Sequence, residues 1–411
     1  MNYELFIAKR IIAGKKYKNS ISSPIIKIAI TAISLGIIIM LIAVATGAGL
    51  QYKIRDKMAG FKGHVQIVNY DSNNSDVSTV SISKNQPFYP KFENIEGIKN
   101  IQVFGYKGGI LRTKTDFEGI IFKGVSTDYD WTFFKEYLVE GSIPNLNLPR
   151  TKEVLLSKTI MNRLQLKLGD TILATFLKTT TSKLPSNKKY TIVGIYNSGF
   201  AEFDKTMMVG DLREVQNLNK WTENEIGGFE VILDSFDNIE EKGEEIYNNI
   251  GSTLNKKTIL ETYPNVFEWI KLFDNNVWFI IAIMILVAGI NMITALLVLI
   301  LERVQLIGIL KALGSTNTSI RKIFLYNASY LILKGLFWGN LIGLSIIFIQ
   351  HYFKVITLDP NTYYVTTMPV HISFTYILLL NIGTLVMSFL MLIIPSYIIT
   401  KINPSKSIKF A

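Results

Sequence analysis

Four long apolar runs constrain the fold of this 411-residue chain more than any other feature. They cover residues 25–50, 277–301, 324–349 and 376–399. A helix needs roughly 20 consecutive apolar residues to cross a bilayer, because each residue advances it by only about 1.5 Å. Each run reaches that length. The sequence therefore predicts a membrane protein with four transmembrane α-helices.

Basic side chains gather beside these runs, in residues 1–27, 302–322 and 400–411. The chain has a formal net charge of +11, and an equal excess of basic over acidic side chains lies in these three segments. Short basic segments stay on the cytoplasmic side of a membrane. We therefore expect a multi-pass protein with both termini and the 302–322 loop in the cytoplasm. The basic charge is explained by topology, and we expect no nucleic-acid partner.

The segment between the first two apolar runs has a different pattern. Short β-prone runs alternate with turn signals, and two helical patterns, at 156–170 and 237–254, interrupt them. This mixture predicts a large α+β extracytoplasmic domain of two lobes. The polar stretch 71–81 is expected to be a surface loop. The predicted strands are 64–68, 101–106, 119–125, 153–157, 171–177, 190–196, 206–210 and 229–234.

These patterns divide the chain into nine parts. In the second span, Val266, Trp269, Ile270 and Phe273 recur at helical spacing ahead of the apolar run, so this helix is expected to project as a stalk. The parts are an interfacial helix (1–24), the first span (25–50), the outer domain (51–265), the stalk and second span (266–301), a cytoplasmic helix loop (302–322), the third span (323–350), a short outer loop (351–375), the fourth span (376–399) and a cytoplasmic tail (400–411).

The sequence carries no visible catalytic site. It has no Cys, which excludes disulfides, thiolate metal sites and Cys nucleophiles, and its three His residues lie far apart. No phosphate-binding loop, nucleophile elbow or zinc-protease motif is present. We expect a non-catalytic chain that binds no metal or cofactor and takes its energy from a partner. A membrane enzyme is the weakest alternative.

The stretch 302–322, ERVQLIGILKALGSTNTSIRK, is a short amphipathic segment between the second and third spans. Ile307, Leu310 and Leu313 fall on one helical stripe. Gly314 is a natural helix stop, and Thr316 or Thr318 is placed to cap the helix that follows. Such a helix suits docking into a groove on a cytoplasmic subunit. Periodicity favours a helix resting on lipid equally well.

Several segments resemble a known family. IGILKALG, followed by IRKIFLY and GLFWGNLIG, resembles the ABC-transporter permeases of the FtsX/MacB superfamily. The opening ELFIAKR, the run VAGINMITALLVLILERVQLIGILKALG and the closing MLIIPSYIITKINPSKSIKF are similar to the lipoprotein-releasing permeases of the LolC/LolE type. In the outer domain, EVLLSKTIMNRLQLKLGD and KLPSNKKYTIVGIYNSGFAEFD also look like that subfamily. The resemblance spans nearly the whole length.

The resemblance implies a transporter of the inner membrane that extracts lipoproteins and passes them to a periplasmic carrier. Its expected partners are two copies of an ATP-binding subunit, which bind ATP and Mg²⁺, and a second permease subunit, either another copy or a related chain. Lipoproteins are the expected substrates, in contact with membrane lipid. A MacB-like efflux permease and an FtsX-like mechanotransmitter that activates a cell-wall hydrolase are the alternatives.

The resemblance also assigns roles to individual residues. The family usually has Glu where this chain has Leu306, so an ion pair with the ATP-binding subunit is lost here. Residues 179–188 match the place where one subunit type carries a hook for the carrier. The coupling-helix residues are Arg303, Gly308, Leu310, Lys311 and Gly314; the hook residues are Thr180, Lys183, Pro185 and Lys188; a lipid cavity is assigned to Ile37, Met40, Trp269, Phe273 and Trp278.

Polar and small residues inside the spans predict helix contacts. Asn291 and Asn340 are placed to hydrogen-bond between helices. Glycines recur at every fourth position of the third span, which predicts a small-residue face for close helix packing. Lys334 lies deep in the same span, and we expect it to snorkel to the inner surface. The glycines are Gly335, Gly339 and Gly343.

Overall fold

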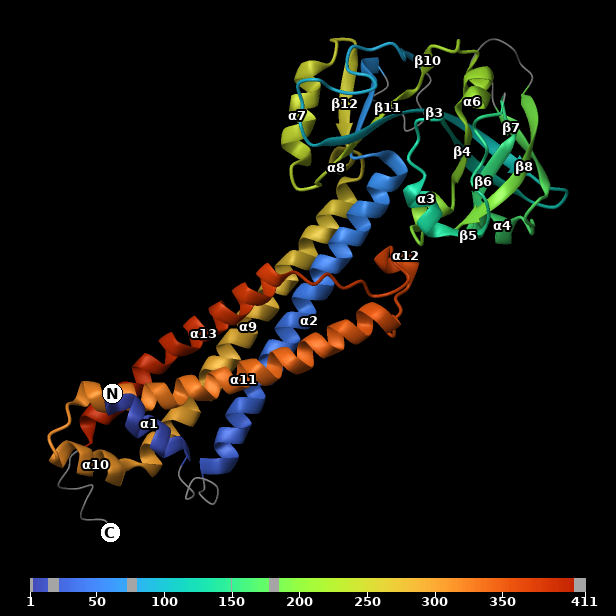
Figure 1. Cartoon of the computed structure of the whole chain (residues 1–411). Helices are drawn as coiled ribbons and strands as arrows, with labels where there is room; N and C mark the ends of the chain where they lie inside the picture. The colour runs from blue at the N-terminus through green and yellow to red at the C-terminus, as the bar shows by residue number, and fades with distance from the viewer. Residues whose placement is uncertain (1–2, 14–21, 72–79, 149, 177–184, 403–411) are drawn as a thin grey trace. The chain divides into compact units, whose positions relative to one another are not determined.

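The computed structural model describes residues 3–13, 22–71, 80–148, 150–176 and 185–402 (Figure 1). It forms two compact units. The transmembrane unit comprises Met1–Gln51, Trp269–Ile356 and Thr367–Ala411, and the sheet domain comprises Tyr52–Glu268 and Thr357–Thr366. The fold class predicted from the sequence, four spans with an α+β domain between the first and second, is confirmed.

Among the described residues, four helices are long and apolar enough to cross a membrane: α2 (Ser22–Lys62), α9 (Pro264–Glu302), α11 (Asn317–Phe353) and α13 (Phe374–Ser396). The first does not end near Leu50, where the sequence placed the end of the span, but continues to Lys62. Its 41 residues extend about 60 Å, roughly twice the hydrocarbon thickness of a bilayer. Shorter segments complete the unit: α1 (Tyr3–Ala13), α10 (Val304–Ala312) and the 3₁₀-helix η3 (Tyr397–Lys401).

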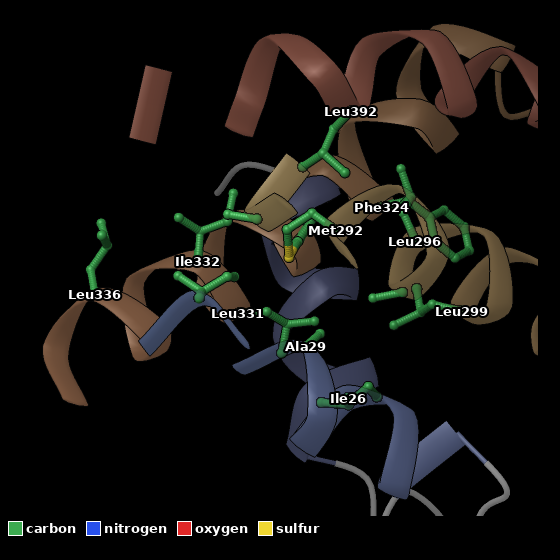
Figure 2. Packing of buried hydrophobic residues seen from close by; sticks show 14 of the residues in the cluster. Ile26, Ala29, Met292, Leu296, Leu299, Phe324, Leu331, Ile332, Leu336 and Leu392 are labelled. Atoms are coloured by element: carbon green, nitrogen blue, oxygen red, sulfur yellow. The ribbon is translucent and has the colours of Figure 1, made fainter. Parts of the chain in front are cut away.

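One hydrophobic core joins these helices. Figure 2 shows Ala29 of α2, Met292 of α9 and Leu331 of α11 pointing toward one another, with Leu392 of α13 above them. Lipid tails are as apolar as these side chains, so close packing rather than removal from water holds such helices together. The core therefore depends on how well the helix surfaces fit.

The glycine face of α11 packs closely against α2. A Cβ added at Gly339 would lie 2.8 Å from the Cβ of Ile37, and one added at Gly335 would lie 2.7 Å from the Cβ of Ile33. The hydroxyl of Ser34 donates to the carbonyl oxygen of Gly335 at 2.9 Å. The small residues predicted from their spacing thus lie against α2, as the interval of four requires.

The sheet domain has two lobes that share the long strand β3 (Figure 1). The first half of β3 pairs with β11, beyond which β1 and β12 follow, and α7 packs beside β12. The second half joins β4, β9, β6, β8 and β7 in a closed ring, because β7 pairs with both β8 and β3. Aromatic and aliphatic side chains, including Phe122, Phe176 and Tyr190, fill that ring.

The elements of this domain have the following bounds: β1 Val65–Asn69, β2 Ile82–Ser83, β3 Ile98–Arg112, β4 Phe117–Val125, α3 Thr132–Tyr137, β5 Leu138–Gly141, β6 Glu153–Ser157, α4 Lys158–Arg163, β7 Thr171–Phe176, β8 Ser186–Tyr196, α5 Ala201–Asp204, β9 Met207–Asp211, α6 Leu212–Asn219, β10 Glu225–Ile226, β11 Gly228–Leu233, α7 Ile239–Asn249, β12 Leu254–Thr258, α8 Ile259–Thr262 and α12 Pro360–Tyr363.

All eight strands predicted from the sequence are present, but both predicted helices are shorter than their patterns. Helix α7 ends at Asn249, ahead of the predicted end at Leu254, which begins β12. The pattern at 156–170 indicated a helix that ends at Gly169, whereas α4 ends at Arg163. The chain leaves the helix because Gln165 adopts a positive φ of 53°. Most of the predicted surface loop at 71–81 lies outside the described residues.

We predict that Gly339→Ala destabilises the transmembrane unit, because the new methyl group overlaps Ile37 and the carbonyl oxygen of Ser34. Overpacking of this kind costs about 1–3 kcal/mol. Gly383→Ala on α13 is the matched control, since a Cβ there meets nothing within 4 Å. Thermal unfolding of both variants in detergent measures the effect. We expect a lower unfolding midpoint for Gly339→Ala and an unchanged midpoint for Gly383→Ala. Equal midpoints would show that the α2–α11 contact is not tight.

Candidate functional site

Helix α10 is a short helix with defined ends between α9 and α11. Its first turn follows Arg303, whose backbone is non-helical, and its last turn closes at Gly314 with a φ of +92°. The amide of Ser315 donates to the carbonyl of Leu310 at 3.0 Å and that of Gly314 to Lys311 at 3.1 Å. This pair of bonds is a Schellman motif, which glycine favours because it lacks a Cβ.

The next helix begins at once. Thr316 caps α11, since its hydroxyl accepts a hydrogen bond from the amide of Ser319 at 3.2 Å. Of the two threonines that the sequence offered, Thr316 is therefore the cap. Local hydrogen bonds thus close the C-terminal end of α10 and cap the start of α11, so the connection between them is a defined turn rather than a plain loop.

One face of α10 is buried within its own chain. Ile307 is fully buried, and Gly308 and Leu310 are also buried, in the same core as Ile320 and Phe324 of α11. The sequence predicted one stripe of Ile307, Leu310 and Leu313, and the resemblance assigned Gly308 and Leu310 to the coupling helix. In the structure Ile307, Gly308 and Leu310 face the transmembrane core, whereas Leu313 is exposed.

The opposite face of α10 is exposed and largely apolar. It consists of Gln305, Ile309, Ala312 and Leu313, and we call it the outer face of α10. The side chain of Leu313 is 78% exposed and that of Ile309 is 44% exposed. Apolar side chains left exposed next to one another on a rigid helix mark a contact surface.

Lys311 is half-buried and bonds within its own chain, although the sequence placed it among the partner contacts. Its ammonium group donates to the backbone carbonyls of Ile399 at 2.8 Å, Thr400 at 3.3 Å and Ile402 at 2.8 Å. These carbonyls belong to the end of the fourth span. The five residues assigned to the coupling helix thus do not share one surface.

Helix α1 also contacts this region. The hydroxyl of Tyr3 lies 3.2 Å from that of Ser315, and the hydroxyl of Ser319 donates to the carboxylate of Glu4 at 2.8 Å. That hydrogen bond lowers the pKa of Glu4 from its ordinary value. Ala8 is buried in the core of the transmembrane unit. The first helix therefore packs against the turn between α10 and α11.

Two protein-family models match this chain. The family model of the MacB-like periplasmic core domain matches residues 28–247, and that of the FtsX-like permease C-terminal region matches residues 278–404, which include α10. The chain belongs to the FtsX/MacB-like permeases. Its homologues are permease subunits of ABC transporters, which are generally non-catalytic.

Curated relatives match over nearly the full length. The chain is 20% identical over 408 residues to the lipoprotein-releasing system transmembrane protein LolC of Xylella fastidiosa (strain 9a5c), with 96% of each chain covered. It is 20% identical to LolC of Neisseria meningitidis serogroup B and 20% identical to LolE of Haemophilus influenzae, with 99% of each chain covered. It is a multi-pass inner-membrane permease of the LolC/LolE type.

Two solved structures are similar to part of this permease. The extracellular domain of the ABC-type transporter YknZ from Gram-positive bacteria is 15% identical, with 47% of this chain and 99% of that chain covered and a TM-score of 0.32. The periplasmic region of MacB from Actinobacillus actinomycetemcomitans is 13% identical, with 50% and 92% covered and a TM-score of 0.33.

The predicted hook lies partly outside the described residues. Thr180 and Lys183 lie outside them, and Pro185 and Lys188 lie within them. Strands β7 and β8 pair from Thr171 opposite Thr191 to Phe176 opposite Ser186. Pro185 is exposed, directly before β8.

The five residues assigned to a lipid cavity do not line one cavity. Ile37 and Met40 are fully buried, and Ile37 packs against α11. Trp269 and Phe273 contact each other, with ring centroids 4.8 Å apart, while Trp278 is 70% exposed. Ile37 and Met40 thus lie inside the bundle, where the glycine face of α11 packs against Ile37.

An apolar groove lies elsewhere in the transmembrane unit, between α11 and α13. Its volume is about 570 Å³, and it is lined by residues such as Leu336, Phe337 and Leu385. Asn340 and Asn381 lie in its wall and hydrogen-bond to each other, at 2.6 Å and 2.9 Å. Each amide also donates to the carbonyl four residues before it. The polar contact between helices predicted for Asn340 is present, with Asn381 as its partner.

Two other polar residues were singled out in the spans. Asn291 of α9 is half-buried. Lys334 is exposed, and its ammonium group lies 4.7 Å from the ring centroid of Tyr330, one turn closer to the start of α11. The start of α11 adjoins the basic loop, so the side chain points in the direction that snorkelling to the inner surface requires.

Sequence reasoning missed a buried charged network in the sheet domain. Lys123 and Glu230 are fully buried, and the ammonium group lies 2.8 Å from both carboxylate oxygens. Lys123 also donates to the carbonyl oxygen of Phe61 in the last turn of α2. Gln102 donates to the same carboxylate at 2.9 Å. This network fastens the end of α2 to strands β3, β4 and β11.

A signal for this network was present in the sequence. Lys123 is the one charged residue in GIIFKGV, and Glu230 is the one acid within GFEVIL. A single charge in an otherwise apolar strand requires a partner of opposite charge. Burial lowers the pKa of the Lys123 amine, and the Glu230 carboxylate opposes that shift.

We predict that Lys123→Met destabilises the sheet domain by about 3–5 kcal/mol, because it leaves the Glu230 carboxylate buried without a cation. The double variant Lys123→Met/Glu230→Met removes both charges and should recover part of that loss. Lys135→Met, at an exposed lysine of α3, is the control. Urea unfolding of the full chain in detergent measures the differences. A double variant less stable than Lys123→Met would contradict a coupled pair.

Proposed function

We propose that this permease releases lipoproteins from the inner membrane and passes them to a periplasmic carrier, driven by ATP hydrolysis in a partner subunit. The observation that carries the proposal is the similarity to lipoprotein-releasing transmembrane proteins over 96–99% of the chain. Both the outer domain and the membrane region fall within that match. The similarity therefore includes the parts that would meet cargo and the part that would meet the energy source.

The outer face of α10 is the surface proposed for the ATP-binding subunit. The chain's own core already holds Ile307 and Leu310, so Ile309 and Leu313 remain for a partner. Two ATP-binding subunits, which bind ATP and Mg²⁺, would serve two permease chains. The basic loop and both termini would lie in the cytoplasm with them.

The exposed side of α9 is proposed to face the second permease subunit and the lipid moiety of the cargo. Trp278, Phe279, Ile283 and Ile290 are all more than half exposed and recur along the span. Trp278 thus remains a candidate for lipid contact, whereas Ile37 and Met40 do not. The hairpin end at Pro185 is proposed for the carrier, with Thr180, Lys183 and Lys188.

Depletion of the permease in its own cell tests the proposed function. We expect mature lipoproteins to accumulate in the inner membrane, as followed by membrane fractionation and immunoblotting. Normal lipoprotein sorting would refute the proposal. Cells that form chains would then point to cell-wall hydrolase activation, and increased drug sensitivity to efflux.

We predict that Leu313→Asp weakens binding of the ATP-binding subunit by more than about tenfold, since loss of a central apolar contact in an interface costs about 2 kcal/mol or more. Copurification of the two subunits from detergent-solubilised membranes measures this. Asn317→Asp is the control, because it places the same charge at a nearby exposed position where the start of α11 favours an acid. Equal losses in both variants would mean that charge alone, and not the apolar face, decides binding.

A further inference from the structure

The end of the fourth span is held by two cations from other parts of the transmembrane unit. Lys311 of α10 donates to three backbone carbonyls, of Ile399, Thr400 and Ile402, at 2.8–3.3 Å. An ammonium group has three N–H donors. All three are therefore engaged within the chain.

These carbonyls need donors from outside their own helix. The last four carbonyls of a helix have no intrahelical partner and carry the negative end of the helix dipole. Helix α13 contains Pro395 and passes into the 3₁₀-helix η3, which ends at Lys401. Lys311 supplies charge-assisted donors to the carbonyls at this end.

Arg321 holds the same end of the fourth span from α11. Its Nε donates to the hydroxyl of the fully buried Ser396 at 3.1 Å, and its guanidinium group lies 3.8 Å from the ring centroid of Tyr397. Arg321 begins the second turn of α11, so this contact joins the early part of α11 to the end of the fourth span.

Apolar packing completes this contact. Ile399 of η3 and Leu392 of α13 are fully buried, in one core with Ile307 of α10 and Phe324 of α11. We call Lys311, Arg321 and these packed side chains the terminal clamp. The clamp joins the inner side of α10 and the early part of α11 to the end of the fourth span. The outer face of α10, which carries Ile309 and Leu313, is not part of it.

We infer that the terminal clamp transmits displacement of α10 to the fourth span, with Lys311 as a positioning residue rather than a contact for the ATP-binding subunit. The inference rests on the proposed function, since a partner must move α10. Because Lys311 is bonded to the end of the fourth span, α10 cannot shift away from η3 without breaking three hydrogen bonds. The fourth span then moves with α10.

Lys311→Met tests the clamp in the full permease, purified with its ATP-binding subunit. We expect the partner to copurify as with the unaltered chain, in contrast to Leu313→Asp. The amides of η3 should exchange with solvent faster, as measured by hydrogen exchange and mass spectrometry. Lipoprotein release should fall roughly 2- to 30-fold, the range found for residues that couple distant sites. Lys311→Arg keeps a cation with several donors and should retain most of the release.

A covalent substitute for the clamp provides the sharper test. The chain has no Cys of its own, so Lys311→Cys/Ile402→Cys can be joined by a short bismaleimide with no competing cysteine in the permease. Joining the two positions should restore release, whereas the same reagent on Lys311→Cys alone should not. If Lys311→Met does not fold, Arg321→Gln is predicted to give the same faster exchange and reduced release.

Three outcomes would overturn the inference. Loss of the partner with Lys311→Met would make Lys311 a partner contact. Unchanged exchange in η3 would show that there is no clamp. Faster exchange with normal release would show that the clamp holds the fold without transmitting motion. If the unaltered permease releases no lipoprotein, the proposed function fails instead, and the exchange measurement still decides whether the clamp exists.

Discussion

The close contact between α2 and α11 is the constraint on which the transmembrane unit depends. In lipid, helices gain little from burying apolar surface, so they associate where their backbones approach closely. Gly335 and Gly339 permit that approach, and Ser34 adds a hydrogen bond across it. This contact holds the middle of α11 against α2, and the turn at Gly314 joins α10 to the start of α11. It also draws Ile37 into the bundle and away from any lipid cavity.

The two sides of helix α10 have different roles. The inner side belongs to the permease, through Ile307, Leu310 and the bonds from Lys311. The outer side leaves Ile309 and Leu313 exposed. A helix that only rested on lipid would not need an inner face joined by hydrogen bonds to the end of another span. These different contacts of the two faces explain why a short helix, and not a flexible loop, connects α9 to α11.

The spans and strands could be predicted from local sequence patterns, whereas the arrangement of the candidate site could not. Apolar runs identified the spans, and alternation identified the eight strands, because both signals lie within a few residues. Strand β12 was missed because LNKKT is polar and forms a strand only by pairing with β1, Val65 opposite Thr258. The predicted helix at 156–170 was too long because its leucines continue the pattern beyond the turn at Gln165.

Prediction of α10 from the sequence was limited for the same reason, because local patterns report only on neighbouring residues. The C-terminal end of α10 and the start of α11 were predicted correctly from Gly314 and Thr316, which act on adjacent backbone. The buried face of α10 was not predicted, because apolar side chains occupy both sides of the helix. The partners of Lys311 lie about ninety positions further along the chain, beyond the reach of any local pattern.

Site-specific photo-crosslinking from α10 tests the central claim most directly. A photoreactive amino acid would replace Leu313, Ile309, Leu310 or Ile307 in turn, in membranes that contain the ATP-binding subunit. The account predicts crosslinks to that subunit from positions 309 and 313, and crosslinks only within the permease from positions 307 and 310. Crosslinks to the ATP-binding subunit from 307 or 310, with none from 313, would contradict it.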